Sequence, residues 1–149
     1  MIPRTGVFLC LMTMSMMISA AEGLISMQSP HSATATMDKL KTVVKDKGLK
    51  VFARIDHAGG ASAIGESLRP TELLIFGNPQ GGTPFMQCAQ TVGIDLPLKV
   101  LVWEDVEGQV WLSYNDLHYL ADRHDVPDCK AVKNIAGALD GIAKTVVSP

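Results

Sequence analysis

Hydrophobic and polar positions follow two different periods along this chain of 149 residues. A period of two predicts β-strands at residues 23–28, 49–57, 71–76, 98–105 and 109–114. Apolar positions spaced by three and four predict amphipathic helices at residues 32–47 and 130–146. Shorter helices are expected at residues 61–68, 83–91 and 117–124. The order β-α-β-α-β-α-β-β-α-α predicts an α+β domain, a two-layer sandwich with one mainly antiparallel sheet and helices on one face.

Residues 49–57 show how the faces of this sheet should be divided. Val51 and Ile55 fall on one side, which we assign to the helices, and Phe52, Arg54 and Asp56 fall on the other. The same opposite phase carries Lys99, Leu101 and Trp103, and a three-residue hairpin loop ending at Gly108 sets Trp103 across from Trp111. Because large apolar side chains mixed with charges rarely face water alone, we expect a second subunit or a ligand on this face.

Residues 69–87 form the most distinctive passage in the chain. The apolar strand ends at Gly77-Asn78-Pro79, crosses Gly81-Gly82, and restarts as a helix. We expect Thr83 to cap that helix, with Pro84 at its first position. A loop of this kind exposes backbone N–H groups and could hold a small anion at the helix N-terminus. It lacks both phosphate-loop and dinucleotide fingerprints, so a tight turn with positive φ angles is the plainer interpretation.

The first 21 residues have the layout of a secretory signal peptide. Arg4 precedes an uncharged apolar core at residues 7–18, and Ser19-Ala20-Ala21 supplies small residues before Glu22. We therefore predict cleavage after Ala21, a domain at residues 22–149, and a periplasmic or secreted location, with a buried N-terminal helix as the alternative. The apolar core is shorter than the ~20 residues of a membrane span, so no stable span is expected after cleavage.

Two cysteines remain in that domain, Cys88 and Cys129. An oxidising compartment permits a disulfide, but the sequence does not show whether the two residues lie close together. We expect two unpaired thiols, with a disulfide as the alternative.

The net charge and the spacing of potential metal ligands argue against a nucleic-acid-binding protein and a metalloprotein. The formal net charge is −2, which provides no electrostatic basis for binding nucleic acid. Cys-x-x-Cys, His-x-x-x-His and His-Glu-x-x-His are all absent, and His118 with Asp122 is better interpreted as a solvated helix face. We expect neither a metal nor a cofactor.

Three runs of sequence resemble the DUF302 domain family: VFARIDHAGGA, LRPTELLIFGNPQGGTPFMQ and GIDLPLKVLVWEDVEGQVWLSYND. The resemblance covers about residues 48–124. It implies a small two-layer domain that forms a homodimer, and it supplies no reaction. The family's motif positions correspond here to Asp56, His57, Arg69, Gly77, Asn78, Pro79, Thr83, Pro84, Asp95, Lys99, Trp103, Glu104 and Tyr114. The two cysteines lie outside the pattern.

Three functional hypotheses follow. The first is a dimeric binding or accessory domain for an undefined small molecule. Its candidate ligand-binding residues are Arg54, Asn78, Gly81, Gly82, Thr83, Lys99 and Trp103. The second is a small enzyme that uses Asp56 and His57 as acid and base on a small anionic substrate, although successive strand residues point to opposite faces. The third is a purely structural dimer module, and the sequence leaves open whether the protein is an enzyme.

Overall fold

A computed structural model describes residues 21–149, so all but the last residue of the predicted signal peptide lies outside the described residues. Five strands form the sheet: β1 (Leu24–Ser29), β2 (Lys50–Asp56), β3 (Thr71–Gly77), β4 (Leu98–Glu104) and β5 (Val110–Asn115). The α-helices are α1 (Ala33–Asp46), α2 (His57–Ala63), α3 (Pro79–Cys88), α4 (Leu117–Arg123) and α5 (Ala131–Val147). A short 3₁₀ helix, η1 (Gln90–Ile94), follows α3. The predicted α+β class and element order are confirmed.

The strands pair in the order β1-β5-β4-β3-β2, and every pairing is antiparallel. The hairpin loop between β4 and β5 sets the register, because Gly108 adopts a φ of 78° that glycine accepts without strain. Trp103 pairs with Trp111 as predicted. Residues 21–149 therefore form a single sheet with β1 and β2 at its edges.

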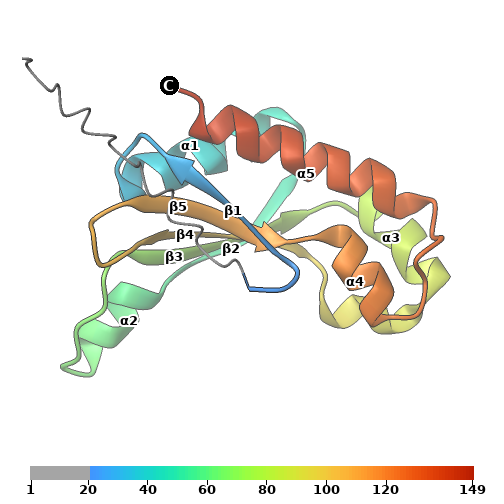
Figure 1. Cartoon of the computed structure of the whole chain (residues 1–149), viewed down its shortest axis with the longest axis horizontal. Helices are drawn as coiled ribbons and strands as arrows, with labels where there is room; N and C mark the ends of the chain where they lie inside the picture. The colour runs from blue at the N-terminus through green and yellow to red at the C-terminus, as the bar shows by residue number, and fades with distance from the viewer. Residues whose placement is uncertain (1–20) are drawn as a thin grey trace, which may run out of the picture.

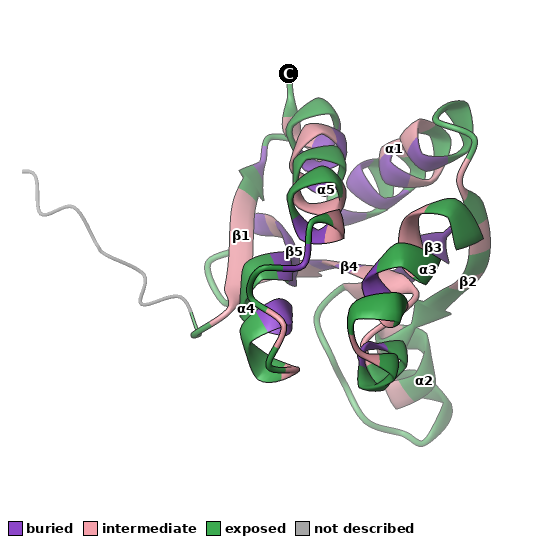
Figure 2. Ribbon diagram, turned by 90° about the vertical axis from the view of Figure 1, so that its right-hand side faces the viewer, coloured by how far each residue is buried: buried purple, intermediate pink, exposed green. Residues whose placement is uncertain are grey.

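Helices α1 and α5 lie side by side over one face of the sheet, and α3 and α4 lie toward one end (Figure 1). Their buried residues face the strands, where the core forms (Figure 2). Alternate strand positions contribute Leu74, Phe76, Val100 and Leu112, all with no exposed surface. The predicted amphipathic pattern therefore agrees with the observed burial, because the apolar sides of the helices and of the strands pack against each other in one core.

A bulge in β2 changes the predicted division of its faces. Val51 pairs with Phe76 and Ala53 with Ile75, which leaves Phe52 without a partner on β3. One extra residue reverses the alternation beyond it. Ile55 therefore lies on the open face of the sheet, and Arg54 lies on the helix side, opposite to both predictions. This correction removes Arg54 from the surface where we expected it to meet a ligand.

Two helices begin earlier than predicted, and side-chain caps explain why. The Asp56 carboxylate accepts from the Gly59 N–H at 2.8 Å, so residues 58–60 belong to α2 instead of a turn. Asn78 Oδ1 accepts from the Gly81 N–H at 2.7 Å, and Pro79 occupies the first helical position of α3.

The predicted glycine-rich loop is consequently the first half of a helix. Gly81 and Gly82 have no positive φ, and Thr83 lies inside α3 instead of capping it. Gly81 has a steric role, because a Cβ there would lie 3.1 Å from Asn78 Oδ1. The tight turn with positive φ angles that we expected at Gly81-Gly82 is therefore wrong, because this segment is the start of a helix.

The expectation of two unpaired thiols was also wrong. Cys88 and Cys129 form a disulfide, with their Cα atoms 6.1 Å apart. The bond joins residues 41 positions apart, at the end of α3 and just before α5. Only the packing of these two helices brings the sulfur atoms together. Within residues 21–149, no helix is both long and apolar enough to cross a membrane.

Candidate functional site

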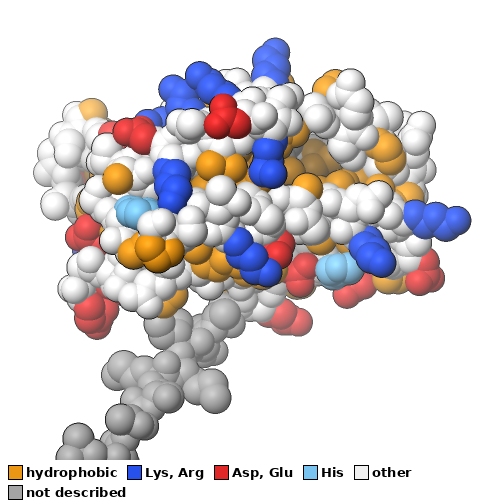
Figure 3. Space-filling view, turned by 90° about the horizontal axis from the view of Figure 1, so that it is seen from above, with side chains coloured by type: hydrophobic (Ala, Val, Ile, Leu, Met, Phe, Trp, Pro, Cys, Tyr) orange, Lys and Arg blue, Asp and Glu red, His pale blue; other side chains and the backbone are white. Residues whose placement is uncertain are grey.

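An apolar pocket of about 590 Å³ lies between α3 and α5. One wall is the segment 77–83 with Met86, and the opposite wall is one side of α5 from Asn134 to Ile142. Gly93, residues 96–98, Leu49 and Phe52 close the remaining sides. From above, hydrophobic side chains gather in a hollow on this helical side of the molecule (Figure 3).

Among residues 21–149, no charged side chain lines this pocket. Its polar side chains are two asparagines, one glutamine and one threonine: Asn78, Gln80, Thr83 and Asn134. Asn78 Oδ1 already accepts from the Gly81 N–H, so its Nδ2 is the group left to donate to a ligand. The bulge supplies Phe52 to the pocket lining, with Lys50 Nζ 5.2 Å from the ring centroid. The pocket is built for an apolar body and a few neutral hydrogen bonds.

The pocket brings together four of the predicted ligand-binding residues: Asn78, Gly81, Gly82 and Thr83. The other three lie elsewhere. Arg54 donates to Asp38 at 2.6 Å and to Glu72 at 3.0 Å. The hydrogen bond with Glu72 raises the pKa of Arg54, against the opposing effect of burial. Arg54 therefore holds α1 to the sheet.

Lys99 serves the loop beside the pocket. Its Nζ donates to the backbone carbonyls of Asp95, at 2.8 Å, and Pro97, at 2.9 Å. Burial lowers the pKa of Lys99, while the nearby negative charge of Asp95 opposes that shift. Lys99 thus supports the turn that carries Leu96 and Pro97 into the pocket wall, instead of presenting its amine on the open face.

The two tryptophans pack together on the open face of the sheet. Their ring centroids are 6.3 Å apart, with an interplanar angle of 24°. Trp103 Nε1 donates to Ser113 Oγ at 2.9 Å, and Trp111 Nε1 donates to Asp105 Oδ2 at 2.7 Å. Both indole donors are satisfied, which agrees with a packing role for Trp103.

Asp56 and His57 lie at the far end of β2, and neither lines the pocket. The Asp56 carboxylate is engaged as the cap of α2. His57 is the first residue of that helix and is exposed, and its ring makes no hydrogen bond within the described residues. The arrangement holds the helix start in place and forms no carboxylate–imidazole pair. An acid–base role for these residues stays a hypothesis.

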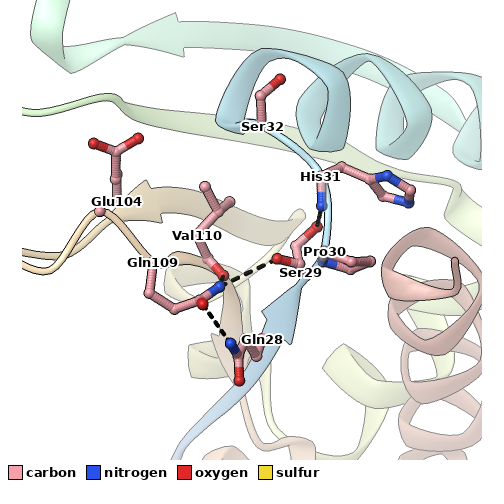
Figure 4. Close-up of a pocket in the computed structure, with 9 residues that line it drawn as sticks. Gln28, Ser29, Pro30, His31, Ser32, Glu104, Gln109 and Val110 are labelled. Carbon is pink, nitrogen blue, oxygen red and sulfur yellow. Dashed lines mark hydrogen bonds between the residues drawn. The ribbon is translucent and has the colours of Figure 1, made fainter.

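A second, polar groove lies where β1 runs into α1, beside the β4–β5 hairpin (Figure 4). Gln109 Nε2 donates to the carbonyls of Ser29, at 3.2 Å, and Val110, at 3.0 Å. Gln28 also bonds to Gln109. Because these side chains bond mainly to their neighbours, the groove offers a ligand few vacant partners.

Sequence reasoning missed a polar network beside the pocket. His124 lies with its Nε2 2.6 Å from Asp95 Oδ2 and its Nδ1 2.9 Å from Thr91 Oγ1. Arg123 donates to the same carboxylate at 3.1 Å. In the sequence, the only sign of this network was that Asp95 is a family motif position. Its partners Arg123 and His124 come from the end of a distant helix, so the local pattern does not reveal the contact. In residues 21–149, no three His, Cys, Asp or Glu residues converge as a metal site.

Comparisons with known proteins identify the fold and the family. Residues 25–142 match the family described as "Domain of unknown function DUF302". A crystal structure of an uncharacterized conserved DUF302 protein from Bacillus stearothermophilus superposes with a TM-score of 0.76, covering 85% of this chain and 99% of that one at 18% identity.

The curated relatives that this chain matches carry the name of an ion channel. "Fluoride-specific ion channel FluC 1" of Brucella suis is 48% identical over 104 residues, which is 70% of this chain and 41% of that protein. The proteins from Brucella abortus and Brucella melitensis match equally, over 38% of their length. The match therefore spans about two fifths of these relatives, and more than half of each lies outside it.

Proposed function

Because this chain belongs to the DUF302 family, whose description assigns no function, we propose from its pocket that it is a binding domain for an uncharged, largely apolar small molecule. The observation that carries the proposal is the pocket of about 590 Å³ between α3 and α5, lined without a charged side chain. Its volume lies within the range of roughly 300–1,000 Å³ typical of small-molecule sites.

The lining chemistry selects against charged ligands. A charge taken from water into this pocket would meet no counter-ion among the lining residues, and burial of an unpaired charge is costly. Apolar surface is favoured at about 25 cal/mol per Å². A neutral ligand with one or two acceptors, matched to Asn78 and Asn134, fits best. The predicted small anionic substrate is therefore less suited to this pocket than a neutral ligand.

Binding of the neutral dye N-phenyl-1-naphthylamine tests the proposal. The Ala138→Trp variant should fill the pocket, because Ala138 lines it from the exposed side of α5. Lys133→Trp, on the same helix and outside the pocket lining, is the matched control. We expect saturable fluorescence enhancement in the wild type and the control, and at least a tenfold weaker Kd in Ala138→Trp. Equal binding by all three proteins would overturn the proposal.

The same domain is proposed to work as a homodimer through the open face of the sheet. Apolar side chains from three adjacent strands are only half-buried there: Leu73, Ile75, Leu101, Trp103 and Trp111. A continuous apolar face of this kind supports an interface with a second copy. Light scattering at increasing concentration should give twice the chain mass, and Leu101→Asp should give a monomer. A wild-type monomer at all concentrations would refute this part.

A second candidate function is an accessory role beside a fluoride channel. Its support is the 48% identity to proteins named fluoride-specific ion channels, in which the matched segment is joined to additional chain. With the predicted signal peptide, such a domain would act in the periplasm or outside the cell. Deleting its gene should then lower the fluoride concentration that halves growth, leave chloride tolerance unchanged, and be reversed by the wild-type gene. Unaltered fluoride tolerance would refute this role and leave the pocket proposal intact.

A further inference from the structure

The Cys88–Cys129 disulfide joins the end of α3 to the segment just before α5, and α3 and α5 form opposite walls of the apolar pocket. Cys88 is the last residue of α3, and Cys129 lies two positions before α5 begins. The wall residue Met86 is two positions before one cysteine, and the wall residue Asn134 is five positions after the other. The covalent bond therefore limits how far these two walls can separate.

The bond is also placed where a reductant can reach it. Cys88 is exposed, and Cys129 is at the margin of the core with 9% of its surface accessible. A dithiol can approach from the Cys88 side without unfolding the sheet. Breaking a bond in this position would change α3 and α5 at their adjoining ends before it disturbed the interior.

A second tie, formed by side chains alone, does not depend on redox state. The Asp95 carboxylate bonds to both His124 and Arg123, which connects the segment after α3 to the end of α4. The side chains of His124 and Asp95 are 7% and 10% exposed, so this contact is largely protected from water. It should hold η1 and the following loop in place when the disulfide is absent.

We propose that the Cys88–Cys129 disulfide is a redox switch for the apolar pocket, an inference that rests on the proposed binding function. With the bond formed, α3 and α5 are held at the spacing that encloses a ligand. A dithiol transfers two electrons: the sulfur–sulfur bond breaks, each cysteine sulfur gains a proton, and the dithiol becomes a disulfide. The freed helix ends move apart, and the pocket loses affinity for apolar ligands.

Binding of N-phenyl-1-naphthylamine to the oxidised protein, and to the protein reduced with dithiothreitol, measures this effect. We expect reduction to weaken the Kd at least tenfold and reoxidation to restore it. The Cys88→Ser/Cys129→Ser variant should bind as weakly as the reduced protein and ignore the reductant. Ala138→Trp, tested in parallel, identifies the part of the signal that comes from the pocket.

The outcomes separate the switch from the binding function. If Ala138→Trp abolishes binding but reduction leaves the Kd unchanged, the pocket is real and the switch is wrong. If Ala138→Trp has no effect in either state, the proposed binding function itself fails.

Weak binding by the double variant could also result from unfolding of that variant. Hydrogen exchange on the reduced wild type therefore distinguishes local opening of the pocket from global unfolding. Reduction should accelerate exchange in α3 and the first turns of α5 and leave β3 and β4 protected. Uniform acceleration across the sheet would show global unfolding and overturn the switch.

Discussion

The two faces of β3 and β4 carry side chains of similar hydrophobicity but have different surroundings. Leu74, Phe76 and Val100 face α1 and have no exposed surface. Their immediate neighbours Leu73 and Ile75 face the other way and stay half-buried. Position in the pleat decides which residues enter the core, because helices cover only one side. The uncovered side is therefore where the monomer has apolar surface left for a partner.

The largest expected difference between the faces is in the free energy of unfolding. Phe76→Ala should lower it by about 3–5 kcal/mol, because the change removes a fully buried ring and leaves a cavity. Ile75→Ala should cost ~1 kcal/mol in the monomer, since part of that side chain already contacts water. Urea unfolding of both variants at low protein concentration measures the contrast. Equal losses would mean that the open face is covered in the monomer.

Tyr114, on the helix-covered side, should make stability depend on pH. Burial raises the pKa of Tyr114 to about 12, from 10.0 for an exposed phenol, and the charges of Asp140 and Asp116 add to the effect. The folded state thus keeps a proton that the unfolded state loses, so stability falls as pH rises from about 10 to 12. Unfolding at about pH 9 and about pH 11.5, on either side of the unfolded-state pKa, should show a smaller decline for Tyr114→Phe. An identical decline in the variant would contradict this assignment.

Arg54 tests what the β2 bulge contributes. Arg54→Met keeps the aliphatic stem but removes the bonds to Asp38 and Glu72, and it should cost about 0.5–1 kcal/mol. The loss should shrink in about 1 M salt, which screens partly exposed ion pairs. Chemical unfolding at two ionic strengths provides the measurement. Asp38→Asn should produce a matching loss, because Asp38 is a partner of Arg54 on the helix side. If Asp38→Asn had no effect on stability, the position of Arg54 on the helix side would be contradicted.

The smallest expected effect concerns Asp105, next to the tryptophan pair on the open face. The hydrogen bond from Trp111 holds the pKa of Asp105 below its usual 3.8, and backbone N–H donors from Gln109 and Glu107 contribute. Trp111→Phe should move this pKa upward, as measured by carboxyl NMR titration. Because the folded-state pKa is lowered, its stabilisation is present above pH 3.8 and is lost on acidification. An unmoved pKa would show that the backbone donors suffice.

Local pattern predicted most of the elements, and failed where a side chain or a bulge intervened. The strand at residues 98–105 and the helix at 130–146 needed only their periodicity, and both are present within a residue or two. Glycines follow Asp56 and Asn78 in the sequence, and we therefore predicted turns at both places. As caps, each with a glycine three positions later, they begin helices instead.

The candidate site was predictable only in part. The segment 77–83 was expected to meet a ligand and does line the pocket, but it is a strand end and a helix start instead of a loop. Arg54 was assigned to the wrong face because alternation carries no sign of a bulge. The wall supplied by α5 was missed because its apolar positions resemble those of any core-facing helix.

Local sequence was enough for the α+β order, the hairpin register and the resemblance to a family, because these depend on periodicity, turn chemistry and unusual runs of residues. Packing in three dimensions determined which pairs of distant residues meet. It joined Cys88 to Cys129 and Asp95 to His124, and it set α3 against α5 to enclose a pocket. These contacts depend on how the helices pack over the twisted sheet, and the spacing of residues along one segment does not encode that packing.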